Sequence, residues 1–132
     1  MKSPRLRILC TEDDADTRDL ICFVLGRNDC DVITSETPAL ALDLAKTAHF
    51  DLYLLDNWMP RMSGTDLCGH LRGFDSKTPI LFYSGAAYPR DKEEAYASGA
   101  QGYLVKPVNN DDLVAEVFRL VTESRESSAA IN

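Results

Sequence analysis

The sequence predicts an α/β protein in which helices cover both faces of a parallel sheet. Two observations indicate this class: five short apolar segments alternate with five stretches of helical periodicity, and the loops between them are short. Strands that alternate with helices form parallel sheets through right-handed crossovers. Nearly continuous apolar strands are typical of a sheet that is buried on both faces. With 132 residues, 45% of them hydrophobic, the chain is expected to form one domain with a substantial core.

Five segments are predicted to be strands because each is short, apolar and followed by polar or turn-forming residues. They are residues 8–10, 31–34, 52–55, 80–83 and 103–105. The segment 31–34 is the most polar of the five, and we therefore expect it at an edge of the sheet.

Five stretches with apolar residues at helical spacing are predicted to be helices. They lie at about residues 20–25, 40–48, 64–73, 90–98 and 111–123. The first is expected to end at residues 26–28, and the second to begin behind Thr37-Pro38, which suits an N-cap and a first turn. The fourth is weakly amphipathic and is expected to end at Gly99, whereas Asn109 or Asn110 would cap the fifth.

The predicted domain covers residues 1–123, and residues 124–132 are expected to be a polar tail or the start of a linker. The first five residues lead directly into a predicted strand, so we expect no signal peptide. No apolar run approaches the roughly 18 residues that a membrane span requires.

Charge and cysteine usage exclude several classes of partner. The net charge of −7 argues against nucleic-acid binding through this domain and against binding to anionic membranes. The four cysteines form no C-x-x-C pair, and His49 and His70 do not lie at zinc-ligand spacing. Reduced, mostly structural thiols are therefore expected, which favours a cytoplasmic location.

Four of the predicted strands lead into polar residues that could handle a phosphoryl group. Glu12 and Asp13 follow the first strand, Asp56 the third, Ser84 the fourth and Lys106 the fifth. The carboxyl ends of parallel strands share one edge, where open α/β sheets bind ligands, so we expect these side chains to meet. The set predicts a divalent metal, a carboxylate nucleophile and two partners for phosphoryl oxygens.

Each of these residues also has a purely structural explanation. Glu12 and Asp13 could be acidic residues favoured by a helix dipole, and Asp56 could be a turn residue. Ser84 could form only a turn, and Lys106 could be a solvated lysine before a helix. Carboxylates gathered at one edge repel one another without a cation, and Mg²⁺ prefers a few carboxylates with water and phosphate oxygens. The combination therefore favours a Mg²⁺ site.

In combination and order, four segments resemble the receiver domain of two-component response regulators, over about residues 5–123. They are ILCTEDD (8–14), DLYLLDNWMPRMSG (51–64), PILFYSG (79–85) and GYLVKP (102–107). The resemblance implies a (βα)5 flavodoxin-like three-layer sandwich with a five-stranded parallel sheet of order 2-1-3-4-5. It also implies phosphorylation by a sensor histidine kinase or histidine phosphotransferase. The domain would catalyse only its own phosphorylation and dephosphorylation.

Carried over to this sequence, the resemblance implies a metal site and a nucleophile. Asp56 would accept the phosphoryl group. Asp13 and Asp56 would ligate Mg²⁺ directly, with help from Glu12, and the backbone carbonyl of Trp58 would be another ligand. Glu12 replaces the more usual Asp of the family, which could lengthen that contact, and Trp58 is a bulky choice at a variable position.

The resemblance also implies a switch that reports phosphorylation. Lys106 would pair with one phosphoryl oxygen and Ser84, in place of the commoner Thr, would hydrogen-bond another. Tyr103 would turn inward when Ser84 moves, and Lys106-Pro107 would be a cis peptide. The signal would pass to a downstream protein partner or an output domain through a surface around Arg90, Tyr96, Tyr103 and Arg119. Phosphorylation could also drive dimer formation.

Three other classes are weighed against this interpretation. A haloacid-dehalogenase-like phosphohydrolase would use an Asp-x-Asp motif, which Asp14-Ala15-Asp16 matches only formally because it falls at the start of a predicted helix. A flavodoxin-like cofactor binder would need a hydroxyl- and glycine-rich phosphate cradle where this chain has carboxylates. A receiver that acts as a scaffold without phosphorylation is the third alternative.

Overall fold

The five predicted strands form one parallel sheet, with β2 at one edge, in the predicted order β2-β1-β3-β4-β5. The computed structural model describes residues 5–131, with side chains as far as residue 128, so residues 1–4 and 132 of the predicted domain and tail lie outside it. The strands are β1 (Leu6–Thr11), β2 (Cys30–Ser35), β3 (Leu52–Leu55), β4 (Ile80–Ser84) and β5 (Gly102–Val105).

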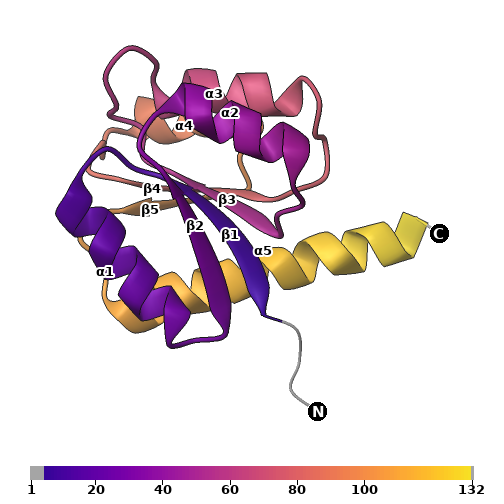
Figure 1. Cartoon of the computed structure of the whole chain (residues 1–132). Helices are drawn as coiled ribbons and strands as arrows, with labels where there is room; N and C mark the ends of the chain where they lie inside the picture. Colours follow the sequence, from indigo (N-terminus) through magenta and orange to yellow (C-terminus); the bar gives the residue numbers. More distant parts are fainter. Residues whose placement is uncertain (1–4, 132) are drawn as a thin grey trace.

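Five helices join and flank the strands and make the predicted three-layer sandwich (Figure 1). They are α1 (Ala15–Gly26), α2 (Pro38–Thr47), α3 (Gly64–Arg72), α4 (Pro89–Ser98) and α5 (Asn110–Ile131). Helices α1 and α5 lie on one face of the sheet, and α2, α3 and α4 lie on the other.

Local sequence signals explain where most helices begin and end. The Thr37 hydroxyl accepts the backbone N–H of Leu40 and caps α2 as predicted. Asp14 caps α1 in the same manner, and its carboxylate accepts the backbone N–H of Thr17. Gly99 ends α4 with φ of 120°, a conformation that L side chains rarely adopt.

Helix α5 continues past residue 123, where the sequence pattern had suggested its end. It reaches Ile131, and Figure 1 shows its last turns running beyond the edge of the sheet. The apolar periodicity does end near Val121, but residues 124–131 contain no glycine or proline to stop the helix. The boundary between domain and tail or linker stays a prediction.

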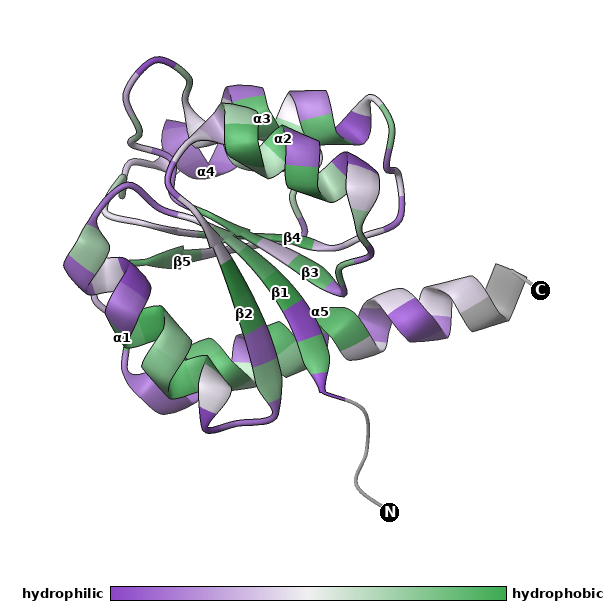
Figure 2. Cartoon of the chain, in the orientation of Figure 1, coloured by the Kyte–Doolittle hydropathy of each residue, from purple (hydrophilic) through white to green (hydrophobic). Residues whose placement is uncertain are grey.

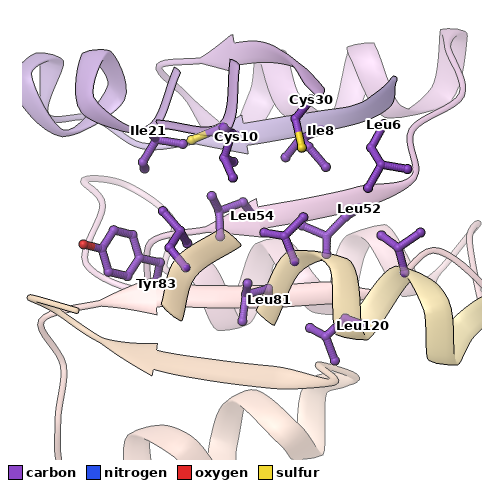
Figure 3. Close-up of a cluster of buried hydrophobic side chains, with 14 residues drawn as sticks. Leu6, Ile8, Cys10, Ile21, Cys30, Leu52, Leu54, Leu81, Tyr83 and Leu120 are labelled. Atoms are coloured by element: carbon purple, nitrogen blue, oxygen red, sulfur yellow. The ribbon is translucent and has the colours of Figure 1, made fainter. Parts of the chain in front are cut away.

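The sheet separates two hydrophobic clusters that hold the layers together. One lies between the sheet and α1 and α5, and Figure 3 shows its side chains. The other lies between the sheet and α2, α3 and α4. Figure 2 shows hydrophobic residues along the strands and hydrophilic residues in the loops. Strands β3 and β4 are buried along their whole length, which gives the loops at their carboxyl ends a rigid base.

All four cysteines are free thiols, and Cys10, Cys30 and Cys68 are buried. Within residues 5–131, every helix is too short or too polar to cross a membrane.

Candidate functional site

The acidic residues predicted to meet at the sheet edge do meet there. Glu12 and Asp13 follow β1, and Asp56 follows the neighbouring strand β3. One carboxylate oxygen from each of the three lies within 4.8 Å of the other two. Glu12 and Asp56 are buried, with 2% and 7% of their surfaces exposed, whereas Asp13 faces solvent. The cluster is therefore open on one side.

Backbone hydrogen bonds extend the sheet ladder into this cluster. The backbone N–H of Glu12 donates to Ser35 O, and that of Asp56 donates to Thr11 O, at 3.2 and 3.1 Å. Behind Asp56, the side-chain oxygen of Asn57 accepts both the backbone N–H and the hydroxyl of Thr65 at the start of α3. Asp56 is thus held between a strand end and a helix start.

Lys106 lies beside the carboxylates, and its nearest partner in this structure is Glu12. Its pairing with a phosphoryl oxygen stays a prediction. The Nζ of Lys106 is 2.5 Å from Glu12 Oε1 and 3.7 Å from Asp56 Oδ2. Burial raises the pKa of Glu12 above its usual value, although the Lys106 hydrogen bond opposes this, and the charge of Asp56 adds to it. Burial would lower the pKa of Lys106, but the hydrogen bond to Glu12 and the charge of Asp56 raise it. The sequence pattern gave no signal for the Glu12–Lys106 pair.

The backbone of Ala86 links the side chains of Ser84 and Tyr103. The fully buried Ser84 hydroxyl accepts the backbone N–H of Ala86 at 3.2 Å, and the Tyr103 hydroxyl donates to Ala86 O at 2.6 Å. The Tyr103 ring stacks on Phe82, with ring centres 5.6 Å apart and planes 7° apart. Tyr103, with 8% of its surface exposed, already lies inward in this structure. An apolar residue such as Ala86 gives no sequence signal of this role.

Other predicted residues take their places around the cluster. The Lys106-Pro107 peptide is cis, as predicted. The backbone N–H of Trp58 donates to Asp56 Oδ1 at 3.3 Å, and its 62% exposed side chain lies against Gly85. The backbone carbonyl of Trp58 as a metal ligand stays a prediction.

The predicted signalling surface is only partly open. Tyr96 on α4 is exposed, and so is Arg90. Tyr103 is buried, whereas Arg119 on α5 is exposed and forms ion pairs with Glu116 and Glu123 of its own helix.

The donor set fits Mg²⁺. Within the described part of the chain, the cluster offers carboxylate oxygens alone, and hard dications prefer such ligands over thiolates and imidazoles. A haloacid-dehalogenase-like site would require the first aspartate of Asp14-Ala15-Asp16 as a nucleophile at the end of the first strand. This structure uses both aspartates at the start of α1 instead. Asp14 caps α1 through Thr17, and Asp16 lies within the first turn of that helix.

The fold and the acidic cluster define an α/β domain that carries carboxylates at the carboxyl edge of its parallel sheet. The family described as response regulator receiver domain matches residues 8–118. The chain therefore belongs to the response regulator receiver domain family.

Several relatives and solved structures are similar to this chain. The cell cycle transcriptional regulator CtrA of Caulobacter vibrioides is 32% identical over 126 residues, which cover 96% of this chain and 54% of that protein. The cell cycle response regulator CtrA of Brucella ovis is 33% identical over the same length. The chain spans about half the length of these curated relatives.

The similar structures support the same conclusion. A CheY-like receiver domain protein from Methanospirillum hungatei superposes with a TM-score of 0.89 at 25% identity, covering 93% of this chain and 98% of that one. The chemotaxis protein CheY4 of Vibrio cholerae gives a TM-score of 0.81 at 30% identity, with coverages of 88% and 98%.

We expect Mg²⁺ to stabilise the wild-type protein and to stabilise Asp13→Asn much less. A ligand that binds only the folded state at about 100 times its Kd adds about 2.7 kcal/mol to the free energy of unfolding. Asp13 is exposed, so the Asn substitution itself should cost little stability. Melting temperatures measured with and without Mg²⁺ test this, and equal shifts for both proteins would refute a shared metal site.

Proposed function

We propose that this receiver domain accepts a phosphoryl group on Asp56 from a sensor histidine kinase or histidine phosphotransferase, and then changes conformation. The observation that carries the proposal is the placement of Asp56. It ends a buried strand, clusters with Glu12 and Asp13, and lies 3.7 Å from Lys106. A carboxylate nucleophile needs this neutralisation because the incoming phosphoryl group is itself negatively charged.

The chemistry follows from these residues. An oxygen of Asp56 attacks phosphorus as the phosphorus–nitrogen bond of the donor's phosphohistidine breaks, and the released imidazole takes up a proton. Lys106 is close enough to pair with a transferred phosphoryl oxygen. Asp13 and Asp56, with Glu12 beside them, would hold Mg²⁺, which supplies charge neutralisation when bound.

The setting of this function is part of the proposal. The domain acts in the cytoplasm and catalyses only its own phosphorylation and dephosphorylation. Its signal passes to a downstream protein partner or to an output domain, and phosphorylation can drive dimer formation. The much greater length of the CtrA relatives supports an output domain outside this chain.

The direct test is labelling with a small acyl phosphate. Incubation of the protein with acetyl phosphate and Mg²⁺, followed by intact mass measurement, should show the addition of one phosphoryl group. Omission of Mg²⁺ should prevent it. A protein that stays unmodified under both conditions would favour the scaffold alternative.

Ser84→Ala should slow phosphorylation and uncouple it from conformational change. The hydroxyl that binds Ala86 N–H would be lost, so Ala86 and Tyr103 would no longer follow the phosphoryl group. Hydrogen exchange of the α4 region, compared before and after phosphorylation, measures the coupling. Ser84→Thr keeps the hydroxyl and serves as the control. An exchange response in Ser84→Ala as large as that of wild type would contradict this coupling.

Trp58→Asn should speed the loss of the phosphoryl group by about tenfold, because a polar group that positions an attacking water is worth at least that. The exposed indole lies against Gly85 beside Asp56, and its one polar group, a ring N–H, cannot accept a hydrogen bond from an attacking water. Trp58→Phe keeps an apolar ring and is the control. Changing Ala86 to Glu as well would bury a carboxylate, since Ala86 is fully buried. Intact mass measured against time gives the rate of phosphoryl loss. Equal rates in wild type, Trp58→Asn and Trp58→Phe would show that the Trp58 side chain does not control the access of water.

A further inference from the structure

The acidic loop between β1 and α1 is held by a side chain that the proposed chemistry does not use. Arg18 is the fourth residue of α1, and its Nη1 donates to the backbone carbonyls of Glu12 and Asp13 at 2.8 and 2.9 Å. Its Nη2 lies 3.5 Å from Glu36 Oε1 in the loop after β2. Only 15% of the Arg18 side chain is exposed.

The backbone carbonyls of Glu12 and Asp13 are not held by the hydrogen bonds of a strand or a helix. Glu12 and Asp13 follow the last residue of β1 and precede the N-cap Asp14, so neither carbonyl belongs to a strand or a helix. The guanidinium is planar and offers five donors in a fixed arrangement, so one side chain can hold two adjacent carbonyls and still face a carboxylate. Arg18 therefore fixes the backbone from which two of the clustered carboxylates project.

From this geometry we propose that Arg18 is a positioning residue for cation binding by Glu12 and Asp13. The inference rests on the proposed function, because it assigns Arg18 a role toward the same Mg²⁺ site. Arg18 touches no carboxylate of the cluster; it acts through the backbone that carries them. Ligands held in place before binding lose less freedom when the cation arrives, and partners that orient metal ligands change affinity by about tenfold or more when removed.

Electrostatics alone predicts that removal of Arg18 changes the Mg²⁺ affinity in the opposite direction, which makes the proposal testable. Arg18 places a positive charge next to a site for a cation, and removal of that charge should by itself tighten Mg²⁺ binding. Loss of positioning should weaken it. The direction of the change in affinity therefore separates the two effects.

The experiment measures the Mg²⁺ dissociation constants of wild type, Arg18→Gln, Arg18→Lys and Arg27→Gln by isothermal titration calorimetry. Arg27 follows the same helix at its far end, with its guanidinium over Phe23, and is the matched control. We expect binding about tenfold weaker in Arg18→Gln and unchanged binding in Arg27→Gln. Arg18→Lys keeps the charge but not the planar fork, so it should also bind more weakly.

A second readout separates positioning from a general structural role. The rate of labelling by acetyl phosphate, measured against Mg²⁺ concentration, should shift to higher Mg²⁺ in both Arg18 variants and recover at saturation. A lower melting temperature with an unchanged dissociation constant would overturn the proposal, and so would tighter binding or wild-type behaviour of Arg18→Lys. If Arg18→Gln does not fold, Arg18→Lys alone decides. A wild-type protein that binds no Mg²⁺ would instead refute the metal site itself.

Discussion

Asp56→Asn is expected to abolish the addition of a phosphoryl group from acetyl phosphate in the presence of Mg²⁺. An amide oxygen is a poor nucleophile, and the substitution keeps the size and shape of the side chain, so the fold should persist. Intact mass measured after equal incubation tests this. Asp16→Asn changes an exposed carboxylate on α1 close to the site and should be labelled like wild type.

The other carboxylates of the cluster are less suited to accept the group. Glu12 is occupied by Lys106 on one oxygen, and its other oxygen accepts the backbone N–H of Asp14 at 3.3 Å. Asp13 is exposed and does not end a buried strand. Undiminished labelling of Asp56→Asn would show that one of these residues is the acceptor and would refute the assignment.

Most of the fold could be predicted because its signals are local. Apolar segments ending in polar residues marked all five strands, and the Thr37 and Gly99 signals marked helix ends. The end of α5 could not be predicted in the same way. The apolar stripe stops near Val121, but the helix continues to Ile131. The polar residues that follow Val121 show no apolar periodicity from which this continuation could be predicted.

The candidate site shows the same division between local and spatial information. The sequence predicted that Glu12, Asp13 and Asp56 would meet, because strand ends share an edge. It could not predict that Lys106 lies closer to Glu12 than to Asp56, because this depends on side-chain reach across two strand ends. Nor could it show Arg18 returning to the carbonyls before its own helix.

Gly64→Ala is expected to destabilise the protein by about 3 kcal/mol and to impair Mg²⁺ binding, since overpacking costs about that much. Gly64 begins α3, and a methyl group there would overlap the backbone carbonyl oxygen of Asp56. The same methyl would lie 2.9 Å from Asn57 Cα and 2.9 Å from Phe82 Cε2. Backbone and a buried ring cannot move aside as a flexible side chain could, so the loop that carries Asp56 must shift.

The control lies in the same helix. Gly69 has open space where a methyl group would go, so Gly69→Ala should stabilise the protein by about 0.5–1 kcal/mol through helix propensity. Urea unfolding of both variants measures the two free energies, and titration with Mg²⁺ reports the site. The two glycines lie five positions apart in α3, and the opposite signs would follow from the close contacts at Gly64 and the open space at Gly69. A Gly64→Ala protein as stable as wild type would show that Asp56 and α3 are not packed as closely as this structure places them.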